Sequence, residues 1–203
     1  MMKRYALLAA AALLASACAS TPAAAPGPSA EPEPAAPAAP AASSVLENMA
    51  ATTHWAADER LLPQDPILAL VKTGGSVNAP AGLSMTCNPD NGRITARLGK
   101  QPASKAGQEA TYTLRLGAAA EKLDGRFVAS PRTGDADFVF PLESVTLRTM
   151  AQLDTVSFVT DAGDVQWTLV RDPNTAVTNA KYVASLKDLN SASQNYLVFC
   201  NPK

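Results

Sequence analysis

Four aspartates near predicted turns are the residues whose type and spacing could do chemistry. Asp135 and Asp137 form one pair, and Asp161 and Asp164 form another. Paired carboxylates can hold a calcium ion or act as the acid and base of a glycosidase. Turns favour Asp in any case, because its side chain bonds to its own backbone, and neither pair is followed by the Gly and spaced Glu of a calcium loop. We therefore predict turn residues here, and an enzyme that acts on glycans with carboxylates alone stays an alternative.

His54 is the one histidine of the chain and lies beside Trp55, ahead of the first strong strand pattern. A hydrolytic nucleophile needs a base, most often His, and no Gly-x-Ser-x-Gly elbow is present. One His and two distant Cys also cannot supply the ligands of a zinc site. We predict no catalytic residue, no metal ligand and no cofactor, and we expect His54 to pack or to be exposed beside an anchoring Trp.

Three arginines fall on the polar faces of predicted strands: Arg93, Arg97 and Arg115. If these strands are neighbours, the side chains form a small basic strip. Such a strip could hold an anionic glycan or a lipid head group by bidentate contacts. The alternative is a solvated sheet face on which the arginines alternate with Thr.

Most of the chain after residue 44 alternates with the period of two that is typical of strands. Residues 82–98 predict a hairpin, because two alternating runs flank Asn91-Gly92, which is a strong hairpin signal. Residues 156–171 predict a second hairpin around the turn at 161–164. Further strands are expected at 110–116, 126–129, 137–140 and 196–200, with a short apolar run at 67–71.

Helical spacing occurs in two places. Apolar residues at 145, 147, 150 and 153 suit one or two helical turns, and Tyr182, Val183, Leu186 and Leu189 predict an amphipathic helix over about 176–190. The predicted fold is mainly β (α+β): an antiparallel β-sandwich or curled sheet of six to eight strands with a C-terminal amphipathic helix.

Charge and length limit the classes of protein. The net charge is −1 over 203 residues, and it becomes −3 if a leader carrying Lys3 and Arg4 is removed. Nucleic-acid binding normally needs a concentrated basic patch, so we predict no nucleic-acid partner. Residues 45–203 are long enough for a single β-rich globular domain with a proper core.

The N-terminus has the three parts of a secretion signal. Lys3 and Arg4 precede ten apolar residues, 6–15, and small residues precede Cys18. The apolar run is much shorter than the roughly 20 residues of a membrane-spanning helix. We predict a signal peptide over 1–17.

Leu14-Ala15-Ser16-Ala17-Cys18 resembles the lipobox of bacterial lipoproteins, although Ala15 stands where Leu is commonest. The resemblance implies that Cys18 is diacylated and becomes the first residue, and that Ala19, rather than Asp, directs the protein to the outer membrane. Ala15-Ser16-Ala17 also fits ordinary signal cleavage, which would release a soluble periplasmic β-rich protein.

Residues 19–44 hold seven Pro and eleven Ala and no aromatic or large aliphatic residue. Such a segment cannot offset its ordering entropy, so we predict that residues 18–44 are the lipidated Cys followed by a disordered tether. If lipid takes Cys18, the two other cysteines, Cys87 and Cys200, are left to form one disulfide, and Cys200 would then return beside the strand of Cys87.

These features predict a non-enzymatic lipoprotein of the cell envelope, held on the outer membrane by its lipid and facing either the periplasm or the surface. It would act as a membrane-tethered binding or assembly module for an envelope protein or a glycan.

Overall fold

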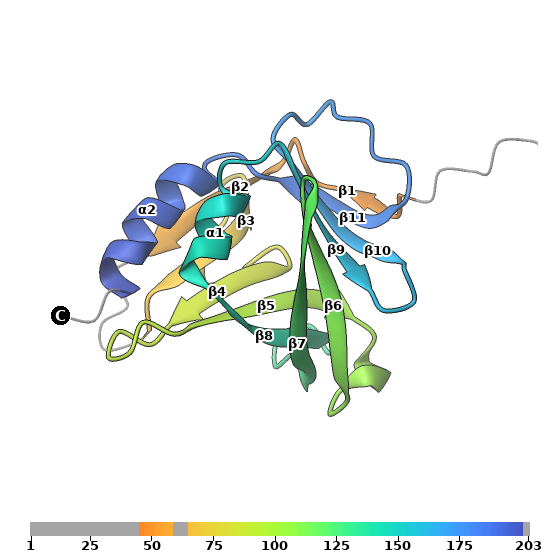
Figure 1. The fold of residues 1–203 in the computed structure, drawn as a ribbon, viewed down its shortest axis with the longest axis horizontal. Coiled ribbons are helices and arrows are strands. Elements are labelled where there is room, and N and C mark those ends of the chain that lie inside the picture. The colour runs from red at the N-terminus through yellow and green to blue at the C-terminus, as the bar shows by residue number, and fades with distance from the viewer. Residues whose placement is uncertain (1–44, 59–64, 201–203) are drawn as a thin grey trace, which may run out of the picture. The chain divides into compact units, whose positions relative to one another are not determined.

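The computed structural model describes residues 45–58 and 65–200. The predicted signal peptide, the lipidated Cys18 and the tether lie outside the described residues. Eleven strands and two α-helices follow one another along the described chain (Figure 1). Their bounds are β1 Glu47–Asn48, β2 Thr53–Asp58, β3 Ile67–Lys72, β4 Leu83–Cys87, β5 Ile94–Gln101, β6 Glu109–Leu116, β7 Ala119–Ala129, β8 Ala136–Leu142, α1 Ser144–Met150, β9 Thr155–Thr160, β10 Val165–Val170, β11 Ala180–Ser185 and α2 Leu189–Cys200, with a 3₁₀ turn at Ala103–Lys105.

All strands belong to one curled sheet with the order β1-β11-β10-β9-β6-β7-β8-β5-β4-β3-β2. The fold is therefore mainly β, as predicted, but the expected six to eight strands were too few. The additional strands include β1, β2 and β11, whose sequences are short or do not alternate. The sheet is also not purely antiparallel, because β11 pairs in parallel with both β1 and β10.

The two ends of this sheet come together at the start of β2. The backbone N–H of Trp55 donates to the Lys187 carbonyl at 3.0 Å, and the Trp55 indole Nε1 donates to the Ser185 carbonyl at 2.8 Å. The Ser185 N–H in turn donates to the Thr53 hydroxyl at 3.1 Å. The chain following β11 therefore covers the first part of the free edge of β2.

The inner face of the curl is the hydrophobic core. Alternate residues of the strands meet there, with aromatic contacts such as Tyr112 against Phe138, whose ring centroids lie 4.4 Å apart. Helices α1 and α2 add buried Leu147, Met150 and Tyr196 to the same cluster. Both helices thus lie on the inner side of the sheet, where their apolar faces are removed from water.

Both predicted hairpins are present. β4 pairs with β5 across the turn at 88–92, and β9 pairs with β10 across the turn at 161–164. Gly92 has a φ of 69°, a conformation that glycine adopts at little steric cost. The helical turns expected near residue 145 are α1.

The C-terminal helix exists, but the prediction of its place was wrong. Residues 180–185 form strand β11, and the predicted last strand at 196–200 is part of α2. The buried residues of α2 recur at intervals of three and one, which is a helical spacing: Leu189, Ala192, Ser193, Tyr196, Leu197 and Cys200. Val183, Ala184 and Ser185 of β11 are all buried, so this part of the strand lacks the alternation that marks a strand in a sequence.

Cys87 and Cys200 form a disulfide, as predicted, across a sequence separation of 113 residues. The bond joins the end of β4 to the end of α2, so Cys200 does not return on a strand. It fixes the last turn of α2 against the sheet.

Candidate groove between strand β2 and helix α2

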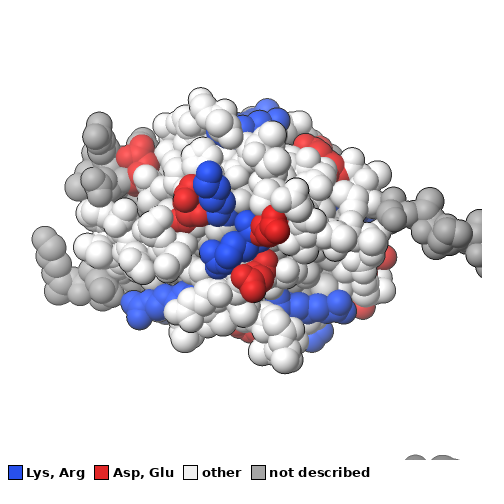
Figure 2. Space-filling model, turned by 90° about the horizontal axis from the view of Figure 1, so that it is seen from above, with Lys and Arg blue, Asp and Glu red and all other residues white. Residues whose placement is uncertain are grey.

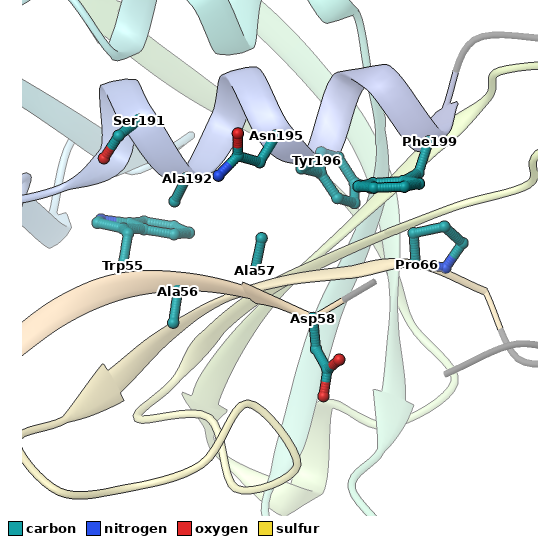
Figure 3. Close-up of a pocket in the computed structure, with 10 residues that line it drawn as sticks. All are labelled: Trp55, Ala56, Ala57, Asp58, Pro66, Ser191, Ala192, Asn195, Tyr196 and Phe199. Carbon is teal, nitrogen blue, oxygen red and sulfur yellow. The ribbon is translucent and has the colours of Figure 1, made fainter. Parts of the chain in front are cut away.

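A groove of about 550 Å³ lies between β2 and α2 (Figure 3). Strand β2 contributes four consecutive residues, α2 contributes residues of one side, and Pro66 closes one end. The lining residues are Trp55, Ala56, Ala57, Asp58, Pro66, Ser191, Ala192, Asn195, Tyr196 and Phe199. This volume is in the range of clefts that bind small molecules.

The wall on β2 follows from strand alternation. Trp55 and Ala57 point toward α2, whereas Ala56 and Asp58 point away from it (Figure 3). Trp55 is almost completely buried and holds its ring in place through the hydrogen bond to Ser185. Ala57 is small, so the space between the strand and the helix stays open beyond Trp55.

The wall on α2 follows from helical spacing. Residues 191, 192, 195, 196 and 199 recur at intervals of one and three, so they share one side of the helix. Phe199 is 38% exposed at the end of this wall, although large aromatic side chains are usually more buried. Val198, its neighbour, is 69% exposed on the other side of the helix, near a smaller cavity of about 300 Å³ between α1 and α2.

The Tyr196 hydroxyl is a polar group that the fold leaves unsatisfied. Tyr196 is only 1% exposed, and within residues 45–58 and 65–200 its oxygen has no hydrogen-bond partner. Burial raises the pKa of Tyr196 far above its ordinary value, and the negative charge of Asp65 adds to the rise. Most buried polar atoms have a partner, so this hydroxyl is an exception among the described residues.

The backbone of β2 is unsatisfied along the same groove. Trp55 donates its N–H to Lys187, on the side away from β3, so every second residue of β2 directs its N–H and C=O to that side. Ala57 is therefore another outward residue. The N–H and C=O of Ala57 and the C=O of Trp55 lie on that side, and no described residue forms a hydrogen bond with any of them.

The three predicted arginines are not brought together as a strip. Arg97 lies on β5 and Arg115 on β6, but β7 and β8 stand between these strands, so the expected adjacency was wrong. Arg93 precedes β5 and is exposed. Arg97 is engaged by Asp137, with Nη1 3.7 Å from Oδ2.

The aspartate pairs lie elsewhere than the groove. Burial raises the pKa of the Asp137 carboxyl, the Arg97 guanidinium opposes this rise, and the charge of Asp135 adds to it. Asp161 and Asp164 are exposed in the β9–β10 turn, where Asp161 lies 4.0 Å from the Lys122 ammonium. None of the four aspartates lines the groove.

His54 is half-buried on β2, where it pairs in register with Val71. Its neighbour Trp55 is the anchoring residue that the sequence suggested.

On the face shown in Figure 2, acidic and basic side chains lie next to one another in the centre rather than in a patch of one sign.

Sequence reasoning missed the groove. Tyr196 was assigned to a strand, and the helical spacing of 192, 196 and 200 was the signal that could have placed it on a helix. The free edge of β2 carries no sequence signal, because it is set by which strands pair across the whole sheet.

Comparisons with known proteins add no relative. No protein-family model matches the chain, no curated protein matches it, and no solved structure matches it. Within the described residues, no helix has both the length and the apolar character needed to span a bilayer.

Proposed function

We propose that this chain is a lipid-anchored module of the cell envelope that binds its partner in the groove between β2 and α2. The observation that carries the binding role is the groove itself, a cavity of about 550 Å³ along which backbone groups of β2 have no partner among the described residues. A ligand that covers these backbone groups has to bond them, because burying an unpaired polar group costs about 1–3 kcal/mol.

The placing of the module rests on the sequence. The lipobox-like segment before Cys18 supports anchoring, and the Pro- and Ala-rich residues 19–44 support a tether that lets the domain reach a partner. The disulfide between Cys87 and Cys200 suits an oxidising compartment. Mass spectrometry of the mature N-terminus tests this part: a diacylated Cys18 is expected, and a free thiol with a free α-amino group would exclude the anchor.

Site-specific photo-crosslinking in cells tests the groove. Asn195 is exposed on the groove side of α2, and Gln194 is exposed on the side of the smaller cavity. A photoreactive amino acid in place of Asn195 should give a discrete crosslinked product, and the same amino acid in place of Gln194 should not. Equal products from both positions, or none from Asn195, would contradict a binding role of the groove.

A further inference from the structure

We infer that the ligand of this groove is an extended peptide segment that pairs with β2 as an additional strand. This inference deepens the proposed function and rests on it. Strand addition joins main-chain hydrogen bonds at a sheet edge to side-chain contacts in a neighbouring groove. The groove of this protein offers both on the same side of β2.

The edge of β2 provides the main-chain partners. Its first part is already used, because the chain after β11 accepts the Trp55 N–H through the carbonyl of Lys187. Beyond that point Trp55 C=O, Ala57 N–H and Ala57 C=O are open in the described structure, on the side away from β3. One donor between two acceptors at strand spacing matches the backbone of an extended peptide, whereas a sugar or a lipid has no such repeat.

Helix α2 provides the side-chain contacts. Tyr196 and Phe199 project from the helix over the part of the groove that Ala57 leaves open (Figure 3). An apolar side chain of the peptide can pack on Phe199, which is partly exposed at the end of the groove. Asp65, next to Pro66 at the end of the groove, lies close enough for its charge to act on Tyr196.

The probe is a displayed library of random linear dodecapeptides, presented to the full chain in detergent. The most enriched peptide is then synthesised and studied by amide hydrogen exchange. At saturation, exchange of the Ala57 N–H should slow at least tenfold, because this amide is open without the peptide. The Ala56 N–H should change little, since it lies on the side of β2 that pairs with β3.

Two groups of variants separate main-chain pairing from mere occupancy. Ala57→Pro removes an outward donor without removing a bond to β3, so a folded domain should lose peptide affinity at least tenfold. Phe199→Ser should also weaken binding several-fold, and Val198→Ser, one residue away on the other side of α2, should leave it unchanged. If the Ala57→Pro chain fails to fold, the peptide is changed instead, by N-methylation of every second backbone amide. Methylation of the amides that face β2 should abolish binding, and methylation of the intervening amides should leave it unchanged.

The outcomes also distinguish this inference from the proposed function. Strand pairing would be overturned if Ala57→Pro left the peptide affinity unchanged and if methylation of either set of alternate amides left it unchanged as well. Failure of the library to yield any groove-dependent peptide would overturn the peptide ligand. In either case a specific crosslink from position 195 to a glycan or a folded protein surface would keep the binding role, and loss of that crosslink would remove the binding role as well.

Discussion

Two buried tyrosines offer a direct test of the claim that the Tyr196 hydroxyl is unsatisfied. Tyr112 and Tyr196 are each 1% exposed and both belong to the main core. They differ in one respect: the Tyr112 hydroxyl donates to Gln101 Oε1 at 3.0 Å, whereas the Tyr196 hydroxyl has no partner in the described part of the chain. Replacement of each by Phe removes the same oxygen from two different environments.

The expected changes in unfolding free energy have opposite signs. Tyr112→Phe loses a hydrogen bond and leaves the buried Gln101 acceptor unpaired, so it should cost about 1–3 kcal/mol. Tyr196→Phe removes a buried group that gains nothing from the fold, so the variant should be as stable as the parent or more stable by about 1 kcal/mol. For a domain of this size, each kcal/mol corresponds to a shift in Tm of about 2–4 °C.

Urea denaturation, followed by tryptophan fluorescence, measures both variants against the parent. A loss of about 1 kcal/mol or more in Tyr196→Phe would refute the reasoning, because it would show that the hydroxyl is bonded in the free protein. A neutral Tyr112→Phe would refute the assignment of its bond to Gln101.

Alkaline pH should destabilise the domain, Gly82 should resist substitution, and the disulfide should carry much of the stability. Burial raises the pKa of Tyr112 to about 12, so the stability that its protonated hydroxyl contributes is complete below pH 10 and is lost as the pH rises from 10 to 12. Tyr112→Phe should flatten this part of a curve of unfolding free energy against pH. An unchanged slope would contradict the role of Tyr112. Gly82 has a φ of 117°, and an added Cβ would lie 2.5 Å from the Trp167 ring. Gly82→Ala should therefore lower the unfolding free energy by about 1–3 kcal/mol more than Gly163→Ala, whose added Cβ meets no atom within 4 Å. Equal urea midpoints of the two variants would contradict this. The disulfide closes a loop of 113 residues and so restricts the unfolded chain. Its reduction should lower the unfolding free energy by up to about 5 kcal/mol. A urea midpoint that is unchanged by reductant would contradict this stabilisation.

The sequence predicted those parts of the fold that short-range chemistry determines. The β4–β5 hairpin was found because Asn91-Gly92 permits a tight turn between two alternating runs. The disulfide followed from cysteine arithmetic. Residues 180–200 were misassigned because consecutive residues of β11 are buried, and its apolar residues continue toward α2 with a spacing that is typical of one helix.

The candidate site could not be predicted in the same way. Trp55 and Ser185 are 130 residues apart, and their contact decides which part of the β2 edge is covered and which part stays open. The arginine strip failed for a related reason: Arg97 and Arg115 were read as neighbours, although the sheet inserts β7 and β8 between them. Local patterns report strand faces well, but strand order depends on the whole chain.

The meeting of the two sequence ends in one sheet imposes an order of events on any chain that emerges N-terminus first. β1 pairs with β11, and the edge of β2 is covered by the residues after β11, so neither can be completed until the C-terminal segment has left the ribosome or a translocation channel. The disulfide waits for the same segment, because Cys200 ends α2. Until then the early strands expose unpaired edges and apolar faces, which are prone to aggregation. A chaperone that holds the nascent chain would therefore act before the last helix arrives, and a truncation that removes α2 should disable folding rather than only the groove.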